Sequence, residues 1–282
     1  MQRLIIGALL ATLACIAPTT ASALVTGHIT IGYEDTQFDY DNNYYYEYYG
    51  QESYDGPSLS AAVVSPLRGD DGPWIIQGDA RLQSQSSDYG YYSQNYEESS
   101  GHAAVHVAYR TDDYAVGGFY GMQNWYGHDI QQVGVEAQKY FSGVTLQGSA
   151  AYGEHDGPYW DSYSAWDAQA SANFYVNPNT TVGVGVGYAA FDYYGGETEL
   201  TTVEVNGEYR FPNTRYSVRA AYIRGDASDT YVDYTTDTFQ VGLVIDLGAG
   251  GAQERDQKGA SLSGADAFDT HWRLWQAGYY YN

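Results

Sequence analysis

Strict alternation of apolar and polar side chains runs through residues 166–191 and constrains the fold more than any other feature. Apolar side chains occupy every second position from Trp166 to Val176, and again from Val182 to Ala190. A period of two is typical of β-strands, because successive side chains point to opposite faces of a sheet. The segment 177–179, Asn-Pro-Asn, interrupts the pattern, and proline cannot continue a central strand. This stretch therefore predicts a hairpin of two long strands.

Each strand of the predicted hairpin has one apolar face and one small or polar face. Each strand also has about the 9–11 residues that cross a bilayer when tilted. A transmembrane β-barrel explains the difference between the faces, because lipid lies outside it and water inside. The alternative of a secreted soluble β-sandwich stays open, since alternation alone does not prove contact with lipid.

The first 23 residues have the pattern of an export signal. Arg3 precedes an apolar stretch over residues 4–16, and Ala21-Ser22-Ala23 matches an A-x-A cleavage site. Leu24 is then the predicted start of the mature chain. The only cysteine, Cys15, lies inside this signal, so we expect neither thiols nor disulfides in the mature protein. A lipoprotein modification at Cys15 is the weaker alternative, because the position three residues before it is unfavourable.

The balance of charge excludes some partners. The formal net charge is −23, and nucleic-acid binding needs lysine and arginine for phosphate contacts. We therefore expect no nucleic-acid partner. We see no apolar run long enough for a membrane helix, so any membrane crossing must be made by strands.

The two-residue alternation recurs along the chain, and it predicts about twelve strands between residues 24 and 247. The predicted connections alternate between short turns and longer loops, as the periplasmic turns and extracellular loops of outer-membrane barrels do. The short ones are at 67–73, 111–113, 142–143, 177–179 and 212–214, and the longer ones are at 35–56, 84–100, 124–129, 154–164, 192–198 and 225–236. The predicted fold is therefore all-β, a transmembrane antiparallel up-and-down β-barrel.

The alternation stops after Leu247. Small and polar residues over 248–269 indicate a flexible linker, and residues 271–281 are apolar and aromatic again. For 248–282 we favour a periplasmic tail. A segment folded into the lumen and a true terminal strand are the alternatives that the sequence leaves open.

The signal, alternating strands such as Thr238–Ile245, and the rhythm of short turns and long loops together resemble the porin-like outer-membrane β-barrel proteins of Gram-negative bacteria. The resemblance covers roughly residues 24–247 and is architectural. It implies a location in the outer membrane, contact with membrane lipid and lipopolysaccharide, and passage of small hydrophilic solutes. It leaves homo-oligomerisation open and implies no cofactor.

Ionisable side chains on the predicted inner face are the candidate lumen-lining residues. Such charges either line a wet channel or pair into a network that fills the lumen, and a barrel of about twelve strands encloses only a narrow one. Gly183, Gly185 and Gly187 leave part of the wall bare, which favours a pore. The candidates are His28, Asp79, Arg81, His106, Arg110, Glu136, Glu204, Glu208, Arg219 and Asp246.

The first predicted long loop is acidic and rich in tyrosine. Its candidate residues are Asp39, Asp41, Tyr44, Tyr45, Tyr46, Glu47, Glu52 and Asp55. Asp39, Asp41 and Asn43 have the spacing that opens an EF-hand, but the required glycine and final glutamate are missing, so we expect no defined metal site. Divalent cations bridging these carboxylates to lipopolysaccharide phosphates, a solvated surface, and tyrosines contacting a sugar or partner are the remaining interpretations.

Enzyme motifs are weak. The segment 185–190 matches a dinucleotide-binding fingerprint but lies within a strand and opens no helix. The dipeptides His128-Asp129 and His155-Asp156 fall at the predicted outer rim, where a histidine oriented by a carboxylate could activate water. The prediction is a non-enzymatic channel with a preference for cations, because the acidic rim concentrates them. A closed structural or adhesive barrel that binds a partner through its tyrosine-rich loops is the alternative.

Overall fold

The computed structural model describes residues 25–40, 51–67, 72–89, 96–125, 128–155, 163–193, 196–229, 233–248 and 251–279. Twelve strands form a closed barrel in which each strand pairs antiparallel with its neighbours in the sequence. The predicted fold class and strand number are confirmed. The strands are β1 (Thr26–Tyr40), β2 (Gln51–Pro66), β3 (Trp74–Tyr89), β4 (Tyr96–Arg110), β5 (Tyr114–Trp125), β6 (His128–Tyr140), β7 (Val144–His155), β8 (Tyr163–Asn177), β9 (Thr180–Tyr193), β10 (Gly196–Arg210), β11 (Tyr216–Asp229) and β12 (Tyr234–Asp246).

The first and last strands close the cylinder. β1 pairs with β12 over thirteen residue positions, from His28 opposite Asp246 to Tyr40 opposite Tyr234. Closure satisfies the backbone groups of every strand, which a structure surrounded by lipid requires. The turn between β10 and β11 contains Asn213 at φ 58°, a left-handed conformation that asparagine tolerates.

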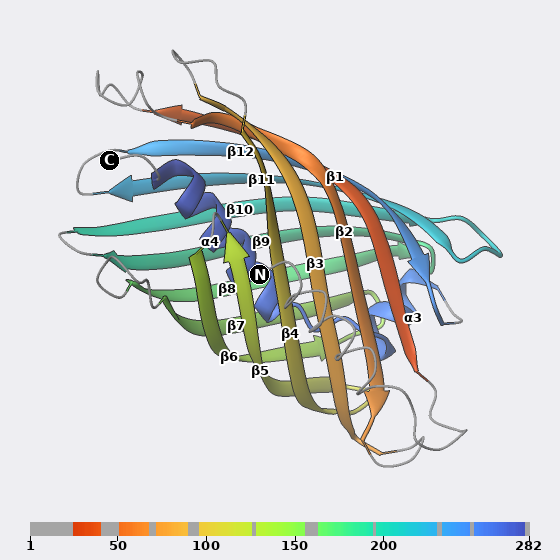
Figure 1. The fold of residues 1–282 in the computed structure, drawn as a ribbon. Helices are drawn as coiled ribbons and strands as arrows, with labels where there is room; N and C mark the ends of the chain where they lie inside the picture. The colour runs from red at the N-terminus through yellow and green to blue at the C-terminus, as the bar shows by residue number, and fades with distance from the viewer. Residues whose placement is uncertain are drawn as a thin grey trace.

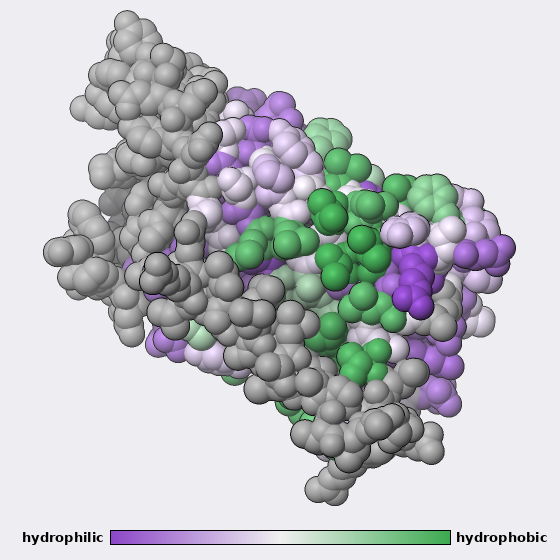
Figure 2. Space-filling model, turned by 45° about the vertical axis from the view of Figure 1, so that its right-hand side comes forward, coloured by the Kyte–Doolittle hydropathy of each residue, from purple (hydrophilic) through white to green (hydrophobic). Residues whose placement is uncertain are grey.

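The outer surface carries an apolar belt. Alternate side chains such as Val135, Val176 and Val186 are 64%, 69% and 58% exposed, although they are large and hydrophobic. Figure 2 shows hydrophobic residues gathered in a band with hydrophilic residues on both sides of it. A soluble protein would bury such a surface, so the belt is the lipid-contacting face of a transmembrane barrel.

Several strands extend beyond the predicted limits at the end of the barrel that carries the longer connections, here called the long-loop end. β1 continues to Tyr40 and β2 begins at Gln51, so the predicted loop over 35–56 is mostly strand. Tyrosines on the outer surface there bond to polar side chains of neighbouring strands. Tyr33 donates to Asp55, and Tyr188 donates to Glu199 at 2.8 Å. The antiparallel pairing of β1 with β2 and β12 thus continues past the segment in which apolar and polar residues alternate.

Two helices follow the barrel, α3 (Ala252–Lys258) and α4 (Gly264–Tyr279). Neither is long and apolar enough to cross a membrane, within the part of the chain that the structure describes. Figure 1 shows α4 inside the ring of strands and α3 near the opposite end, the short-turn end. A periplasmic tail was expected for 248–282, but the described part of it, residues 251–279, folds back into the barrel.

The helical periodicity of α4 explains why it enters the lumen. Ala265, Phe268, Trp272 and Trp275 are spaced by three and four residues, so they share one helix face, and all are at most 2% exposed. They form the main apolar cluster of the barrel interior together with wall residues such as Phe191. Residues 251–269 of the predicted linker are also ordered, and Ala260 and Leu262 belong to a second apolar cluster with wall residues such as Val64 and Ile75.

Candidate functional site

The candidate site is the lumen, which the wall and the C-terminal segment 251–279 share. At the short-turn end, the Ala252 amide donates to the Pro178 carbonyl at 2.9 Å. Arg255 of α3 contacts Glu208 at 2.5 Å and Asp246 at 3.0 Å, and Arg210 also reaches Asp246 at 2.7 Å. Two wall carboxylates therefore hold the start of the segment through charge-assisted hydrogen bonds.

Polar side chains of the wall satisfy the backbone between the two helices. Gln77 donates to the Leu262 carbonyl at 2.6 Å and accepts from its amide at 3.1 Å. Arg110 donates to the Gly259 carbonyl at 2.7 Å, and Gln138 donates to the Ser261 carbonyl at 2.8 Å. A buried chain without regular structure needs such partners, so the wall is built to receive this connection.

A buried histidine links the wall to the start of α4. Each ring nitrogen of His106 lies 2.6 Å from a carboxylate oxygen, one of Asp79 and one of Glu136. The imidazole therefore lies between two carboxylates, and its Nδ1 atom forms a hydrogen bond with Glu136. The other oxygen of Glu136 accepts from the Gly264 amide at 3.1 Å, so the helix begins against this network.

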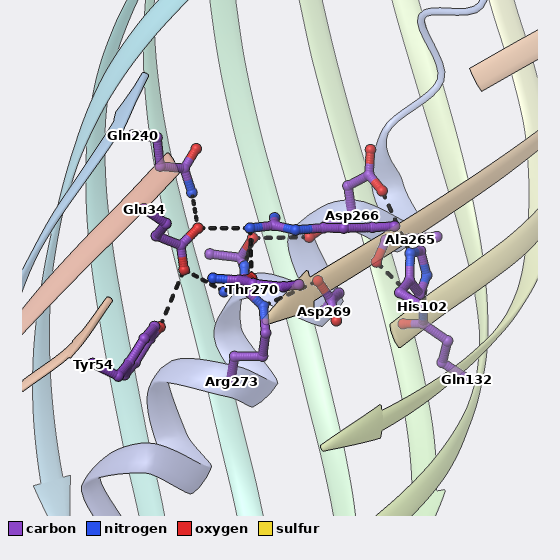
Figure 3. A network of polar contacts seen from close by, with 12 residues as sticks. Glu34, Tyr54, His102, Gln132, Gln240, Ala265, Asp266, Asp269, Thr270 and Arg273 are labelled. Carbon is purple, nitrogen blue, oxygen red and sulfur yellow. Dashed lines mark hydrogen bonds and ion pairs between the residues drawn. The ribbon is translucent and has the colours of Figure 1, made fainter. Parts of the chain in front are cut away.

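A second network holds the middle of α4 (Figure 3). Arg273, 2% exposed, pairs with Glu34 of β1 and donates to Asp269 at 3.1 Å. Glu34 also accepts from Arg81 at 2.7 Å and from Gln240 at 2.8 Å. One wall carboxylate is therefore shared by two guanidinium groups, and this satisfies a charge that would be costly alone.

Aromatic packing completes the contact of α4 with the wall. The rings of Trp275 and Phe191 stack at 4.8 Å with an interplanar angle of 5°. His271 pairs with Asp167 and lies 2.8 Å from the Thr202 hydroxyl. A Cβ atom at Gly187 would lie 2.4 Å from the His271 ring, so only glycine admits the helix this closely.

A cavity of about 340 Å³ remains beside the segment. Its lining comes from β1–β3 and β7–β12 on one side, and from the C-terminal segment on the other. Gln169, Ser171 and Asn206 give it amide and hydroxyl groups, and Gly185 adds no side chain, although an added Cβ would make only ordinary contact there, at 3.5 Å from its nearest neighbour. The lumen is thus narrowed by the segment but retains a polar space.

The structure places all ten candidate lumen residues on the inner wall. Arg110, Glu136, Glu208 and Asp246 hold the segment directly or through its backbone. His106 and Asp79 pair with each other beside it. The remaining four, His28, Arg81, Glu204 and Arg219, line the cavity.

Sequence reasoning missed several wall residues that hold the segment. Glu34 directly precedes the predicted loop over 35–56, beyond the alternating segment, and it was not identified as an inner-face residue. Gln77 and Asp167 alternate correctly with apolar neighbours but are not distinguishable from other polar wall residues. On α4, the spacing of Asp269 and Arg273 by four residues is the signal that would have indicated a helix.

The acidic loop residues are only partly within the described chain. Asp39 and Asp55 lie in strands rather than in a loop, and Asp55 accepts from Ser86 at 2.7 Å. The strand ladder continues through these polar positions, which corrects the predicted loop. For Glu52 only the backbone is described. Asp41, Tyr44, Tyr45, Tyr46 and Glu47 lie outside the described residues.

The predicted rim dipeptides form no visible active site. His155 is 2% exposed and faces the interior. Asp156 and the His128 side chain lie outside what the structure describes. Among the described residues, no group of three histidine, cysteine, aspartate or glutamate side chains could hold a metal ion.

No protein-family model and no curated protein sequence matches the chain. Solved structures do match. The CymD monoaromatic hydrocarbon channel is 9% identical, with a TM-score of 0.53 over 79% of this chain and 89% of that one. The translocator domain of the autotransporter NalP from Neisseria meningitidis is 12% identical, with a TM-score of 0.52 over 84% and 92%. With its closed cylinder and exposed apolar belt, the chain has the fold of the porin-like outer-membrane β-barrel proteins.

Proposed function

We propose that this protein is an outer-membrane channel for passive diffusion of small hydrophilic solutes, and that its C-terminal segment restricts the lumen. The observation that carries the proposal is the polar cavity between this segment and the wall of β1–β3 and β7–β12. A barrel whose interior served only stability would be filled by side chains. The fold shared with the CymD channel supports the same role.

The cavity favours cations over anions. Six carboxylates line it, from Glu34, Asp79, Glu204, Glu208, Asp256 and Asp266, against three guanidinium groups, from Arg81, Arg219 and Arg255. A narrow space with an excess of carboxylates concentrates cations, and salt weakens the effect. The proposal is non-enzymatic, because the ionisable groups of the wall mostly hold the C-terminal segment.

The alternative role is a closed barrel that acts as a structural or adhesive protein. The observation in its favour is that ion pairs hold the segment at α3 through Arg255 and at α4 through Arg273. In that case the cavity would not connect the two ends of the barrel. Contacts with lipopolysaccharide and with a partner of the tyrosine-rich loops belong to this alternative as well.

Ion conductance tests the proposal. The purified chain, reconstituted in a planar bilayer, should give small single-channel currents. Its reversal potential in a salt gradient should show cation preference that declines as ionic strength rises. Absence of any current would favour the closed barrel, and anion preference at low salt would contradict the proposed selectivity.

A further inference from the structure

Arg219 differs from the other arginines of the lumen. Arg81, Arg110, Arg255 and Arg273 each donate to a carboxylate or a backbone carbonyl within 3.0 Å, and Arg210 forms an ion pair with Asp246 at 2.7 Å. Arg219 forms no hydrogen bond or ion pair within the described ranges, although it is exposed and lines the cavity. An unpaired guanidinium with five donors is suited to bind a carboxylate in a bidentate way.

Arg219 has a glycine as its neighbour on one adjacent strand and a glutamate on the other. It lies opposite Gly242 of β12, where an added Cβ would be 3.6 Å from its Cγ atom. On its other side it lies opposite Glu208 of β10, whose Oε2 atom already accepts from Arg255 at 2.5 Å. The other oxygen of Glu208, Oε1, has no hydrogen-bond partner among the described residues, and Arg219 forms no ion pair with it, so the guanidinium lines the cavity without a direct partner.

A carboxylate with a similar position lies farther along the wall. Glu204 lines the same cavity opposite Gly185 of β9, where an added Cβ would be 3.6 Å from the Glu204 Cβ. Its Oε1 atom accepts from Asn206 at 2.8 Å, and it forms no ion pair with any residue that the structure describes. The cavity thus holds a guanidinium and a carboxylate that are both unpaired, each beside a glycine.

The spacing of these two groups sets the size of a ligand that could join them. Glu204 and Glu208 are four residues apart on β10, roughly 13 Å of strand, and Arg219 is level with Glu208. Both side chains line the same cavity, and the flexible stem of arginine allows its guanidinium to move along the wall towards Glu204. An extended dipeptide places its ammonium and carboxylate about 7 Å apart, and a cavity of about 340 Å³ can contain it.

We propose that the cavity is a binding subsite for zwitterionic solutes of the dipeptide class, with the carboxylate on Arg219 and the ammonium on Glu204. This rests on the proposed channel function and names its solute class. A plain anion would pair with Arg219 and leave Glu204 unpaired, and a plain cation would pair with Glu204 and leave Arg219 unpaired. A zwitterion pairs with both groups, because its two charges are complementary to them.

Calorimetric titration of glycylglycine into the full-length protein in detergent tests this proposal. Wild-type protein should bind it, and Arg219→Gln and Glu204→Gln should each weaken binding at least tenfold. N-acetylglycine, which lacks the ammonium, glycinamide, which lacks the carboxylate, and inorganic phosphate should bind wild type at least tenfold more weakly. Arg224→Gln, which changes an exposed arginine outside the lumen, should leave glycylglycine binding unchanged.

Arg219→Lys provides a second variant, which keeps the charge but loses the bidentate geometry and should bind with intermediate affinity. Glycylglycine affinity that is unchanged in both Arg219 variants would overturn the site. Equal affinity for phosphate or N-acetylglycine would also overturn it, because the site would then be one for anions. Conductance without glycylglycine binding would refute this inference alone, whereas binding without conductance would refute the channel function alone.

Discussion

Replacing Arg273 with methionine should loosen α4 from the wall. The substitution keeps much of the side-chain volume but removes the cation that pairs with Glu34 and Asp269. Removing one partner of a buried ion pair costs about 3–5 kcal/mol, because the other charge stays buried. Glu34 retains Arg81 at 2.7 Å and Gln240 at 2.8 Å, so the lower end applies, about 3 kcal/mol. That change corresponds to about a hundredfold increase in the undocked population.

Hydrogen exchange of the α4 backbone amides measures that population in the folded barrel, since local opening exposes them. Arg273→Met should accelerate their exchange about a hundredfold. Adding Glu34→Gln to Arg273→Met should slow α4 exchange at least tenfold relative to Arg273→Met alone, because a neutral amide then replaces the buried carboxylate. Arg224→Met removes an exposed pair with Asp237 and should not change α4 exchange. The reasoning would be refuted if α4 amides of Arg273→Met exchanged at the wild-type rate, or if the double variant exchanged as fast as Arg273→Met.

Three further predictions concern the wall, the belt and the segment. Gly187→Ala should displace α4 and accelerate its amide exchange, at a cost of about 1–3 kcal/mol, because its Cβ would lie 2.4 Å from His271. Gly185→Ala, whose nearest neighbour would be 3.5 Å away, is the matched control and should change nothing. Val184→Arg, on the belt, should destabilise the barrel by about 2–4 kcal/mol in urea unfolding from phospholipid vesicles; an unchanged midpoint would contradict lipid contact. Burial raises the pKa of the Asp256 carboxyl above its usual value, so the docked form of α3 binds this proton more readily than the undocked form. Docking of α3 should therefore strengthen as the pH falls towards the raised pKa. Amide exchange of α3 measures this pH dependence, and Asp256→Asn should abolish it.

The sequence predicts the barrel well because lipid imposes a strict rule on alternate residues. Val182, Val184 and Val186 face outward as expected, and they are 43%, 45% and 58% exposed. The rule fails where lipid ends. Beyond Glu34, β1 carries polar side chains such as Asp35 on its outer face and buried ones such as Thr36 and Phe38 on its inner face. Alternation between an apolar and a polar face cannot reveal a strand of this kind. The first long loop was therefore predicted too long.

The C-terminal segment was harder to predict for a different reason. Its apolar face consists of Phe268, Trp272 and Trp275 at helical spacing, but the sequence preceding them is polar and rich in small residues. Its position depends on partners that are distant in sequence, such as Gln77 with Leu262. Propensity describes each element alone, whereas these contacts exist only once the barrel has closed.

Single-channel conductance of the full-length chain and of a chain ending at Leu247 tests the central claim most directly. The β1–β12 pairing closes the barrel without residues 248–282, so the shortened chain should still insert and resist heat in detergent. Its lumen should lose the obstruction, and its conductance should be several times that of the full-length protein. Equal conductance of the two chains would contradict a lumen occupied by α3 and α4.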